Sequence, residues 1–248
     1  MKKVEVLSLA LEFLMSKNIF KFKQFEIIQE KSAMKIGTDG VLLGAWAEIE
    51  NPKNILDIGS GTGLISLMMA QRFPQAKIKA IEIEKNAFEE SKINFEYSPF
   101  ADRCEVLHTS LQKFTTEEKF DLIVSNPPFF ELTHKIDSNR NLARQQLNLS
   151  FDELLFHAES LMDIKGSIAC IIPYSNEKTF LKIADNLNLF PEKITRVKGN
   201  KEVEFKRSLI QLKKEKTRTI IDQLIIEKER NIYTSAYIDL TKDFYLKM

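Results

Sequence analysis

The sequence predicts an α/β fold that is doubly wound around a mostly parallel β-sheet. From residue 54 onward, short runs rich in β-branched residues alternate with longer helical patterns. This alternation is typical of βαβ units, whose helices cover both faces of a parallel sheet. Past Pro191 the pattern changes to strands separated by turn and charged residues, which suits antiparallel additions at one edge of the sheet.

The expected elements follow one another in a regular order. Five parallel strands are predicted at 54–59, 77–83, 104–109, 120–126 and 166–173, and C-terminal strands at 194–200, 207–214 and 219–229. Helices are predicted at 64–71, 85–97, 151–162 and 175–187. Ser150 should cap the third of these helices, and Ser175 or Asn176 the fourth. Residues 111–114 leave room for only one helical turn.

Length and composition favour one large domain. The chain has 248 residues, of which 44% are hydrophobic and 29% charged, values ordinary for a soluble globular protein. Residues 18–248 are expected to form a single domain. Residues 1–17 are expected to be an extension, either a helix or an over-long start assignment. Glu5 and Glu12 interrupt its apolar run, so a signal peptide is not predicted and a cytoplasmic location is expected.

The sequence gives little support for disulfides, metal sites or membrane-spanning segments. Cys104 and Cys170 lie in apolar surroundings, so buried thiols in a reducing compartment are expected. His108, His134 and His157 are scattered, and no metal site is predicted. No apolar run approaches the roughly 20 residues that a membrane-spanning helix needs.

A glycine-rich turn, LDIGSGTG, connects the first predicted strand to the first helix. Gly59, Gly61 and Gly63 allow a tight turn and the close approach of a ligand where any Cβ would clash. The dinucleotide pattern G-x-G-x-x-G would require glycine at Leu64, and the G-K-[ST] of a P-loop is absent. A different nucleotide-type pocket is therefore predicted at the carboxyl end of this strand.

The spacing D-x-G-x-G-x-G, from Asp57 to Gly63, resembles motif I of the class I S-adenosylmethionine (SAM) methyltransferases. The next strand supplies Glu82, at a distance where a carboxylate can accept both ribose hydroxyls of a nucleoside. SAM is therefore the expected cofactor. The alternative is an ordinary tight turn with a solvated glutamate, and the common register of Asp57, the glycines and Glu82 speaks against it.

The fourth strand ends in Asn126-Pro127-Pro128-Phe129, which resembles the motif of amino-methyltransferases. The lone pair of an exocyclic amine is delocalised into its ring, so the amine is a poor nucleophile. Hydrogen bonds to the Asn126 side-chain oxygen and the Pro127 carbonyl would aim that lone pair at the methyl carbon. Both prolines would hold these carbonyls rigid, and Phe129 would stack on the target ring. The alternative is a plain turn with Phe129 and Phe130 in the core.

The segment KIGTDGVLLGAW (residues 35–46), together with LDIGSGTG and SNPPFF, resembles the bacterial tRNA1(Val) adenine-37 N6-methyltransferase family. The resemblance runs from about residue 18 to the C-terminus. It implies a seven-stranded Rossmann-like methyltransferase sheet, SAM as cofactor, and the anticodon loop of a tRNA as substrate. It also implies Lys35, Thr38 and Asp39 near the methionine end of SAM. An equally favoured reading makes Thr38 or Asp39 a helix cap.

One position departs from the usual pattern. Methyltransferases of this class usually carry Asp after the third strand, to accept the adenine amino group of SAM, and this chain has Ser110. A hydroxyl can accept the same hydrogen bond, though without charge. Weaker or differently tuned SAM binding is expected from this substitution.

A basic rim is expected to bind the phosphates of the RNA. Residues 193–218 hold ten lysines and arginines against three glutamates. The rim would also draw on Lys17, Lys21, Lys23, Arg140 and Arg144, with the last two in a loop-like insertion, 131–148, that also holds His134 and Lys135. Solvated charge without RNA contact is the alternative reading for each lysine.

Other acceptors stay open at this point. Guanine N2 of ribosomal RNA, adenine of DNA and glutamine of a release factor are methylated at similar Asn-Pro-Pro-aromatic sites. A non-catalytic RNA-binding module with a relict SAM pocket is the alternative from another class, although the intact Asn126 and Asp57 speak against it. A monomer is favoured.

Overall fold

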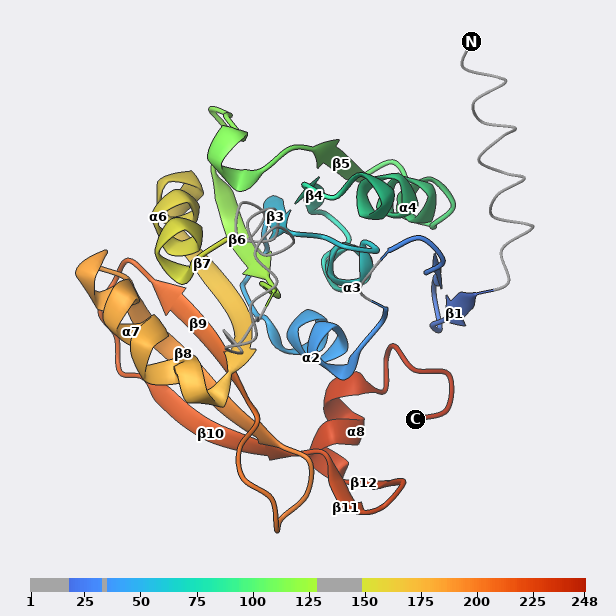
Figure 1. The fold of residues 1–248 in the computed structure, drawn as a ribbon, viewed down its shortest axis with the longest axis vertical. Helices are drawn as coiled ribbons and strands as arrows, with labels where there is room; N and C mark the ends of the chain where they lie inside the picture. The colour runs from blue at the N-terminus through green and yellow to red at the C-terminus, as the bar shows by residue number, and fades with distance from the viewer. Residues whose placement is uncertain (1–17, 33–34, 129–148) are drawn as a thin grey trace, which may run out of the picture.

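The computed structural model describes residues 18–32, 35–128 and 149–248. Its main sheet has eight strands (Figure 1). In spatial order they are β10 (Ile220–Ile225), β8 (Phe190–Lys198), β9 (Arg207–Lys213), β7 (Met162–Pro173), β6 (Phe120–Ser125), β3 (Asn54–Ile58), β4 (Lys77–Glu82) and β5 (Cys104–His108).

The strand directions confirm the predicted fold class. The five strands from β7 to β5 are parallel to one another, and β9 runs antiparallel to both β7 and β8. The sheet has eight strands rather than seven because β10 pairs in parallel with the outer edge of β8, satisfying backbone groups that an edge strand leaves open. The predicted strand at 219–229 therefore divides, and β11 (Glu227–Glu229) pairs separately with β12 (Ile232–Tyr233).

Helices cover both faces of the sheet, as Figure 1 shows. One face carries α2 (Thr38–Trp46), α3 (Leu64–Arg72), α4 (Lys85–Glu96) and α8 (Ser235–Thr241), and the other carries α6 (Phe151–Leu161) and α7 (Glu177–Asn186). Successive side chains of a strand point to opposite faces. Accordingly Ile55 packs in the first core cluster, and Leu56 and Ile58 pack in the second.

Two short 3-10 helices and a hairpin complete the fold. The single turn expected near residues 111–114 is η1 (Leu111–Lys113), and η2 (Tyr174–Asn176) precedes α7. The hairpin consists of β1 (Ile19–Lys21) and β2 (Glu26–Ile28), upstream of the main sheet. In the described part of the chain, none of the helices combines the length and the apolar character required to cross a membrane. No group of three or more potential metal ligands occurs there either.

The predicted helix caps are confirmed at α6, confirmed in position only at α7, and wrong at α2. Ser150 and Glu153 form a reciprocal capping box at the start of α6. At α7 the cap position belongs to Asn176, whose side chain makes no capping hydrogen bond. At α2 the cap is Gly37, and Thr38 and Asp39 lie inside the first turn. The Asp39 carboxylate instead accepts a hydrogen bond of 2.7 Å from the Arg207 Nε atom.

The two cysteines differ in burial. Cys170 is buried as expected, but Cys104 is only partly buried because β5 is an edge strand of the sheet. Desolvation nevertheless raises the pKa of both thiols to about 12. Both groups are therefore unreactive thiols at neutral pH.

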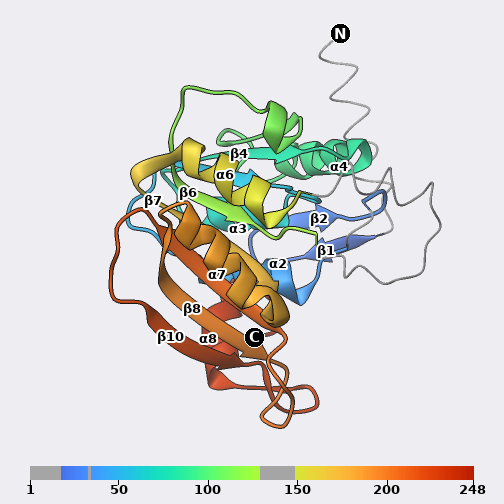
Figure 2. The ribbon, with the colours of Figure 1, turned by 60° about the vertical axis from the view of Figure 1, so that its left-hand side comes forward.

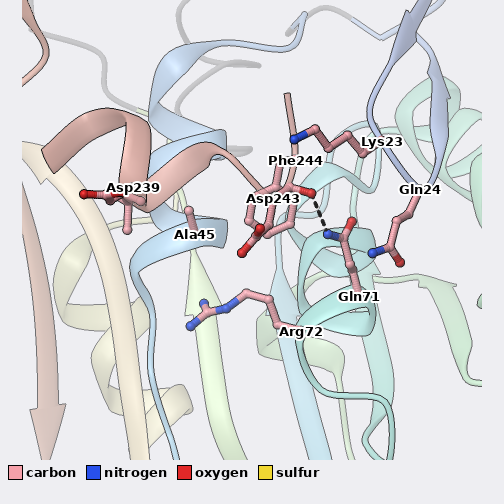
Figure 3. A pocket seen from close by; sticks show the side chains of 9 residues that line it. Lys23, Gln24, Ala45, Gln71, Arg72, Asp239, Asp243 and Phe244 are labelled. Atoms are coloured by element: carbon pink, nitrogen blue, oxygen red, sulfur yellow. Dashed lines mark hydrogen bonds between the residues drawn. The ribbon is translucent and has the colours of Figure 1, made fainter. Parts of the chain in front are cut away.

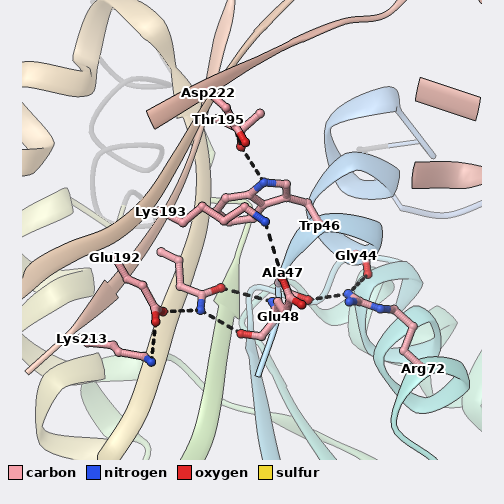
Figure 4. A network of polar contacts seen from close by, with 11 residues as sticks. Gly44, Trp46, Ala47, Glu48, Arg72, Glu192, Lys193, Thr195, Lys213 and Asp222 are labelled. Atoms are coloured by element: carbon pink, nitrogen blue, oxygen red, sulfur yellow. Dashed lines mark hydrogen bonds and ion pairs between the residues drawn. The ribbon is translucent and has the colours of Figure 1, made fainter. Parts of the chain in front are cut away.

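A polar network fastens the C-terminal end of α2 to the sheet (Figure 4). The buried Trp46 donates from Nε1 to the Thr195 Oγ1 atom at 2.8 Å, and Thr195 in turn donates to Asp222 on β10. From α3, Arg72 donates to the carbonyls of Gly44 and Ala47, which closes the end of α2. The network holds in place the helix whose N-terminus reaches the site described below.

Replacing Trp46 by Phe should lower the free energy of unfolding by about 1–3 kcal/mol, because the change removes buried volume and the hydrogen bond to Thr195. Urea unfolding would measure the loss. A double-mutant cycle with Thr195→Val should show coupling between the two positions, and strictly additive effects would contradict the importance of this bond.

Candidate active site

The glycine turn adopts left-handed backbone at each of its three glycines. Their φ angles are +75° at Gly59, +56° at Gly61 and +83° at Gly63. A Cβ added at Gly63 would lie 2.5 Å from the Phe95 ring, whereas one added at Gly59 or Gly61 would have no heavy atom within 4 Å. Gly63 is therefore required for packing against α4, and the other two glycines face open space that a ligand can enter.

A pocket of about 330 Å³ lies at this turn. It brings together Lys35, Thr38, Asp39, Gly59, Gly61 and Asn126, all of which were predicted site residues. They come from three distant segments: the start of α2, the turn after β3 and the end of β6. The other lining residues are Ile36, Gly37, Gly40, Ser60, Thr62, Leu64 and Ile65.

Asn126 directly follows the last residue of β6 and lines the same pocket as the glycine turn. It lines the pocket and is half-buried, so it is not packed into the interior. Pro127 is buried and Pro128 is exposed. The Ser125 hydroxyl donates to the Ile58 carbonyl at 2.9 Å, which fixes the end of β6 against the end of β3. The amide is thereby held at a constant position relative to the glycine turn.

Asp57 does not line the pocket. Its carboxylate is completely buried beneath the turn, where Oδ2 accepts hydrogen bonds from the Ser66 backbone N (3.1 Å) and Oγ (2.7 Å). Oδ1 has no hydrogen-bond partner among the described residues. Burial, opposed by the bonds from Ser66, raises the pKa of Asp57 to about 7. The carboxylate supports the start of α3, and a direct role in cofactor binding stays a prediction.

Glu82 also acts on the turn rather than lining the pocket. Its Oε2 atom accepts from the Gly61 backbone N at 2.8 Å, and Oε1 accepts from the Glu84 N at 2.8 Å. Each carboxylate oxygen can accept more than one hydrogen bond, so these contacts leave capacity for a ribose. The predicted ribose contact is compatible with this geometry and stays a prediction.

Ser110 lies after β5, at the start of η1. Its carbonyl accepts hydrogen bonds from the backbone N of Lys113 (3.1 Å) and Phe114 (3.0 Å), and its side chain is half-buried. It is not among the residues that line the pocket. Contact between Ser110 and the adenine of SAM therefore stays a prediction.

The segment before α2 is tied to the turn by polar residues of α4. Asn94 is fully buried and donates to the carbonyls of Ile28 (3.0 Å) and Thr62 (2.8 Å). The Glu90 carboxylate accepts from the backbone N of Glu30, Lys31 and Ser32. Sequence reasoning missed both residues. The available signal was a pair of polar side chains four residues apart on the face of α4 that carries its apolar residues.

Lys35 is partly engaged by the same segment. Its ammonium group donates to the backbone carbonyls of Gln29 and Glu30, and the Ile36 backbone N donates to Gln29 Oε1 at 2.8 Å. The lysine therefore stabilises the entry to α2 as well as lining the pocket. Its predicted contact with the methionine end of SAM stays a prediction.

The predicted basic rim is partly neutralised. Five of its ten C-terminal cations form ion pairs, with nitrogen-to-oxygen distances between 2.6 and 3.5 Å. These pairs are Lys193–Glu48, Arg196–Glu177, Arg207–Asp39, Lys213–Glu192 and Lys214–Glu159. At the other end, Lys21 pairs with Glu26. These side chains have structural partners, so the charge available to a phosphate is smaller than the sequence indicates.

Several predicted residues lie outside the described ranges. Phe129 follows the last described residue of the Asn-Pro-Pro segment. The insertion at 131–148, the N-terminal extension and the basic residues within them also fall outside. These are Lys17, His134, Lys135, Arg140 and Arg144.

A larger pocket, of about 540 Å³, lies elsewhere, between the hairpin, α2, α3 and α8 (Figure 3). Lys23, Arg72, Asp239 and Asp243 contribute charges of both signs to its lining. The Gln71 Nε2 atom donates to the Asp243 carbonyl at 2.9 Å across it. With the exception of Lys23 from the predicted rim, none of the predicted site residues lines it, so size does not identify the active site here.

Replacing Gly61 by Ala should leave the fold largely intact and weaken SAM binding, because the new methyl group would point into the open pocket. The left-handed backbone would cost about 1–2 kcal/mol of stability. Replacing Gly63 by Ala should destabilise the fold more, because of the clash with Phe95. Calorimetric titration with SAM and thermal unfolding would separate the two effects, and equal behaviour of the two variants would contradict this assignment.

The ionisation of Asp57 should make stability depend on pH. The folded-state pKa of about 7 exceeds the ordinary value of 3.8, so the folded state binds more protons between these values. The free energy of unfolding should therefore fall as pH rises from about 4 to about 7. In Asp57→Asn this contribution should vanish, so the melting temperature of the variant relative to the wild type should rise with pH. A constant difference from pH 5 to pH 8 would contradict the assignment.

Comparison with known proteins agrees with the geometry of the site. The family described as "Methyltransferase small domain" matches residues 31–171. Among solved structures, a predicted O-methyltransferase from Agrobacterium tumefaciens superposes with a TM-score of 0.65 at 20% identity, covering 83% of this chain and 96% of that one. The TYW2 protein of P. horikoshii in complex with MeSAdo has a TM-score of 0.56 at 15% identity, over 79% and 71% of the two chains. These likenesses support the fold.

Relatives of higher identity cover nearly the full length. A tRNA1(Val) (adenine(37)-N6)-methyltransferase of Flavobacterium johnsoniae is 49% identical over 93% of this chain and 100% of its own. One from Christiangramia forsetii is 50% identical over 94% and 100%. With the glycine turn and Asn126 at one pocket, and with identity of this extent, the chain belongs to the tRNA1(Val) (adenine(37)-N6)-methyltransferase family.

Proposed function

We propose that this protein transfers a methyl group from SAM to the exocyclic N6 atom of an adenine in tRNA, adenine 37 beside the anticodon of tRNA1(Val). The observation that carries the proposal is the position of Asn126, half-buried in the same pocket as Gly59 and Gly61. Relatives at 49% and 50% identity, matched over their whole length, bear the name of this activity.

The residues around the pocket fit SAM. Gly59 and Gly61 leave space where any side chain would project. Their left-handed φ angles are a backbone conformation that residues with a side chain rarely adopt. The Glu82 carboxylate lies against the same turn, in reach of the Gly61 backbone N. When bound, SAM supplies an electrophilic methyl group on a sulfonium.

The chain's own contribution is to position the target amine. The Asn126 side-chain oxygen and the Pro127 carbonyl would each accept a hydrogen bond from the N6 amino group. These bonds favour a more pyramidal nitrogen and direct its lone pair towards the methyl carbon. The prolines cannot donate to a strand ladder, and Ser125 anchors the preceding residue to β3, so the acceptors are preorganised.

No strong general base is required. The methylated amine carries a positive charge after the transfer and is strongly acidic, so its proton can pass to a neighbouring carbonyl or to water. The Asn126 side-chain oxygen and the Pro127 carbonyl are hydrogen-bond acceptors and not strong bases. They therefore suit a reaction that depends on orienting the amine.

The sequence resemblance and the relatives favour tRNA over the other acceptors considered above. We further propose that residues 18–248 act as one domain, that the enzyme works in the cytoplasm, and that it acts as a monomer. Methyl-transfer assays on tRNA, ribosomal RNA, DNA and a release factor would compare the acceptors directly.

Replacing Asn126 by Ala should lower the rate of tRNA methylation by about 100-fold or more, because a hydrogen bond that orients the reacting nitrogen is lost. SAM binding should be little changed. Asn86→Ala, the same substitution at an exposed position on α4, is the matched control and should retain full activity.

Nucleoside mass spectrometry provides the corresponding test in the cell. The tRNA of cells lacking this protein should lose N6-methyladenosine, and the wild-type gene should restore it where the Asn126→Ala gene does not. Undiminished N6-methyladenosine in the tRNA of the deleted strain would rule out the proposed function.

A further inference from the structure

We propose that Tyr174 and Phe205, flanked by Arg196 and Lys198, form a platform on which an unpaired base of the tRNA stacks beside the target adenine. The inference rests on the proposed function and adds to it the surface that holds the RNA. We call these four residues the stacking platform.

The platform alternates cationic and aromatic groups. The Tyr174 and Phe205 ring centroids are 5.3 Å apart, with 54° between the ring planes. The Arg196 guanidinium lies 5.7 Å from the centre of the Tyr174 ring, and the Lys198 ammonium lies 5.5 Å from that of Phe205. All four side chains are partly exposed. Aromatic rings interleaved with cations are the arrangement that binds bases and backbone of single-stranded nucleic acid.

The platform is held rigidly from behind. Glu177, which is buried, accepts hydrogen bonds from Arg196 Nε (3.1 Å) and from its terminal nitrogen (2.7 Å), and also from the Ser208 hydroxyl (2.5 Å). The Lys198 ammonium donates to the Lys201 carbonyl at 3.0 Å. Such anchoring lowers the entropy lost when a ligand binds.

Backbone contacts set the positions of the two rings. The Tyr174 backbone N donates to the Lys206 carbonyl at 3.1 Å, immediately beyond Phe205. The Lys206 backbone N donates to the Val197 carbonyl at 2.8 Å. Residues from the ends of β7 and β8 and from the start of β9 thus meet in one place.

The platform lies at the carboxyl ends of the parallel strands, the same end of the sheet that carries Asn126. Tyr174 follows the last residue of β7, and β7 is the direct neighbour of β6, with Cys170 opposite Ser125. Pro173 lies opposite Arg207, and Arg207 pairs with Asp39 of the pocket lining. Figure 2 shows β6 and β7 running in the same direction towards this end of the sheet. The platform is therefore connected to the pocket wall by consecutive contacts.

The charges next to the platform suit a phosphate backbone. Lys198 and Lys206 form no ion pair in the described part of the chain, in contrast to Lys193, Lys213 and Lys214 towards the other end of β8 and β9. Bases of an anticodon loop are already unpaired, so one can stack on protein without the cost of opening a duplex. The platform therefore suits a nucleotide flanking the target adenine.

The test compares tRNA binding by purified full-length variants without SAM, measured by filter binding. Tyr174→Leu and Phe205→Leu keep apolar volume and remove the aromatic face, and each should weaken binding about 10-fold, as expected for a lost base stack. Tyr174→Phe keeps the ring and should bind as the wild type does. Lys198→Gln should lower the slope of log affinity against log salt by about one, as expected for a lost phosphate contact.

Phe190→Leu is the matched control. Phe190 lies at the opposite end of β8 and also carries a cation over its ring, the Lys216 ammonium at 5.5 Å. The Phe190→Leu variant should bind tRNA with wild-type affinity, and its thermal stability should match that of the platform variants. Wild-type affinity in folded Tyr174→Leu and Phe205→Leu, or equal loss in Phe190→Leu, would overturn the proposal.

The outcome is separable from that of the proposed function. If the wild-type enzyme methylates tRNA and the platform variants keep its affinity and KM, the platform alone is refuted. If the wild type binds and methylates no tRNA, the proposed function fails with it. A raised KM for tRNA with unchanged SAM affinity in the leucine variants would support the platform.

Discussion

The left-handed turn between β3 and α3, held in shape by β4, is the constraint on which the site depends. The backbone N of Gly59 and of Ser60 donate to the Ile81 carbonyl, and Gly61 donates to the Glu82 carboxylate. These bonds keep the Gly59 and Gly61 positions turned towards open space, and Gly63 is fixed by packing against Phe95. Without the turn, the carboxyl ends of the central strands would present no hollow for a nucleoside.

The second requirement is that separate segments converge on this hollow. Ser125 ties the end of β6 to β3, and Arg207 ties the start of α2 to β9 through Asp39. Asn94 connects the upstream segment to the turn through the Thr62 carbonyl. Each contact is a hydrogen bond between elements far apart in the chain. These hydrogen bonds fix the segments around the pocket relative to one another, and a reaction driven by orientation requires such fixed positions.

Charge on this protein serves structure as much as recognition. Arg72 closes the end of α2, Arg196 fills the neighbourhood of the buried Glu177, and Arg207 fixes Asp39. Where a carboxylate or backbone carbonyls hold a guanidinium, fewer of its N–H donors are free for a phosphate. Lys198, which forms no ion pair in the described part of the chain, lies over the Phe205 ring. This pairing favours recognition of RNA by stacking together with charge over recognition by a broad basic surface.

The succession of strands and helices from β3 to β9, the glycine turn and the Asn-Pro-Pro exit of β6 could be predicted from the sequence, because periodicity, glycine and proline act within a few residues. The remaining features depend on contacts between distant segments. Asp39 and Arg207 are 168 positions apart, and Asn94 and Thr62 are 32 apart, so no local pattern could pair them. The same holds for β10, whose apolar run was visible but whose parallel place beside β8 depends on which edge stays open. Asp57 shows the limit most clearly: its position was predicted, but burial directed its carboxylate to Ser66 beneath the turn.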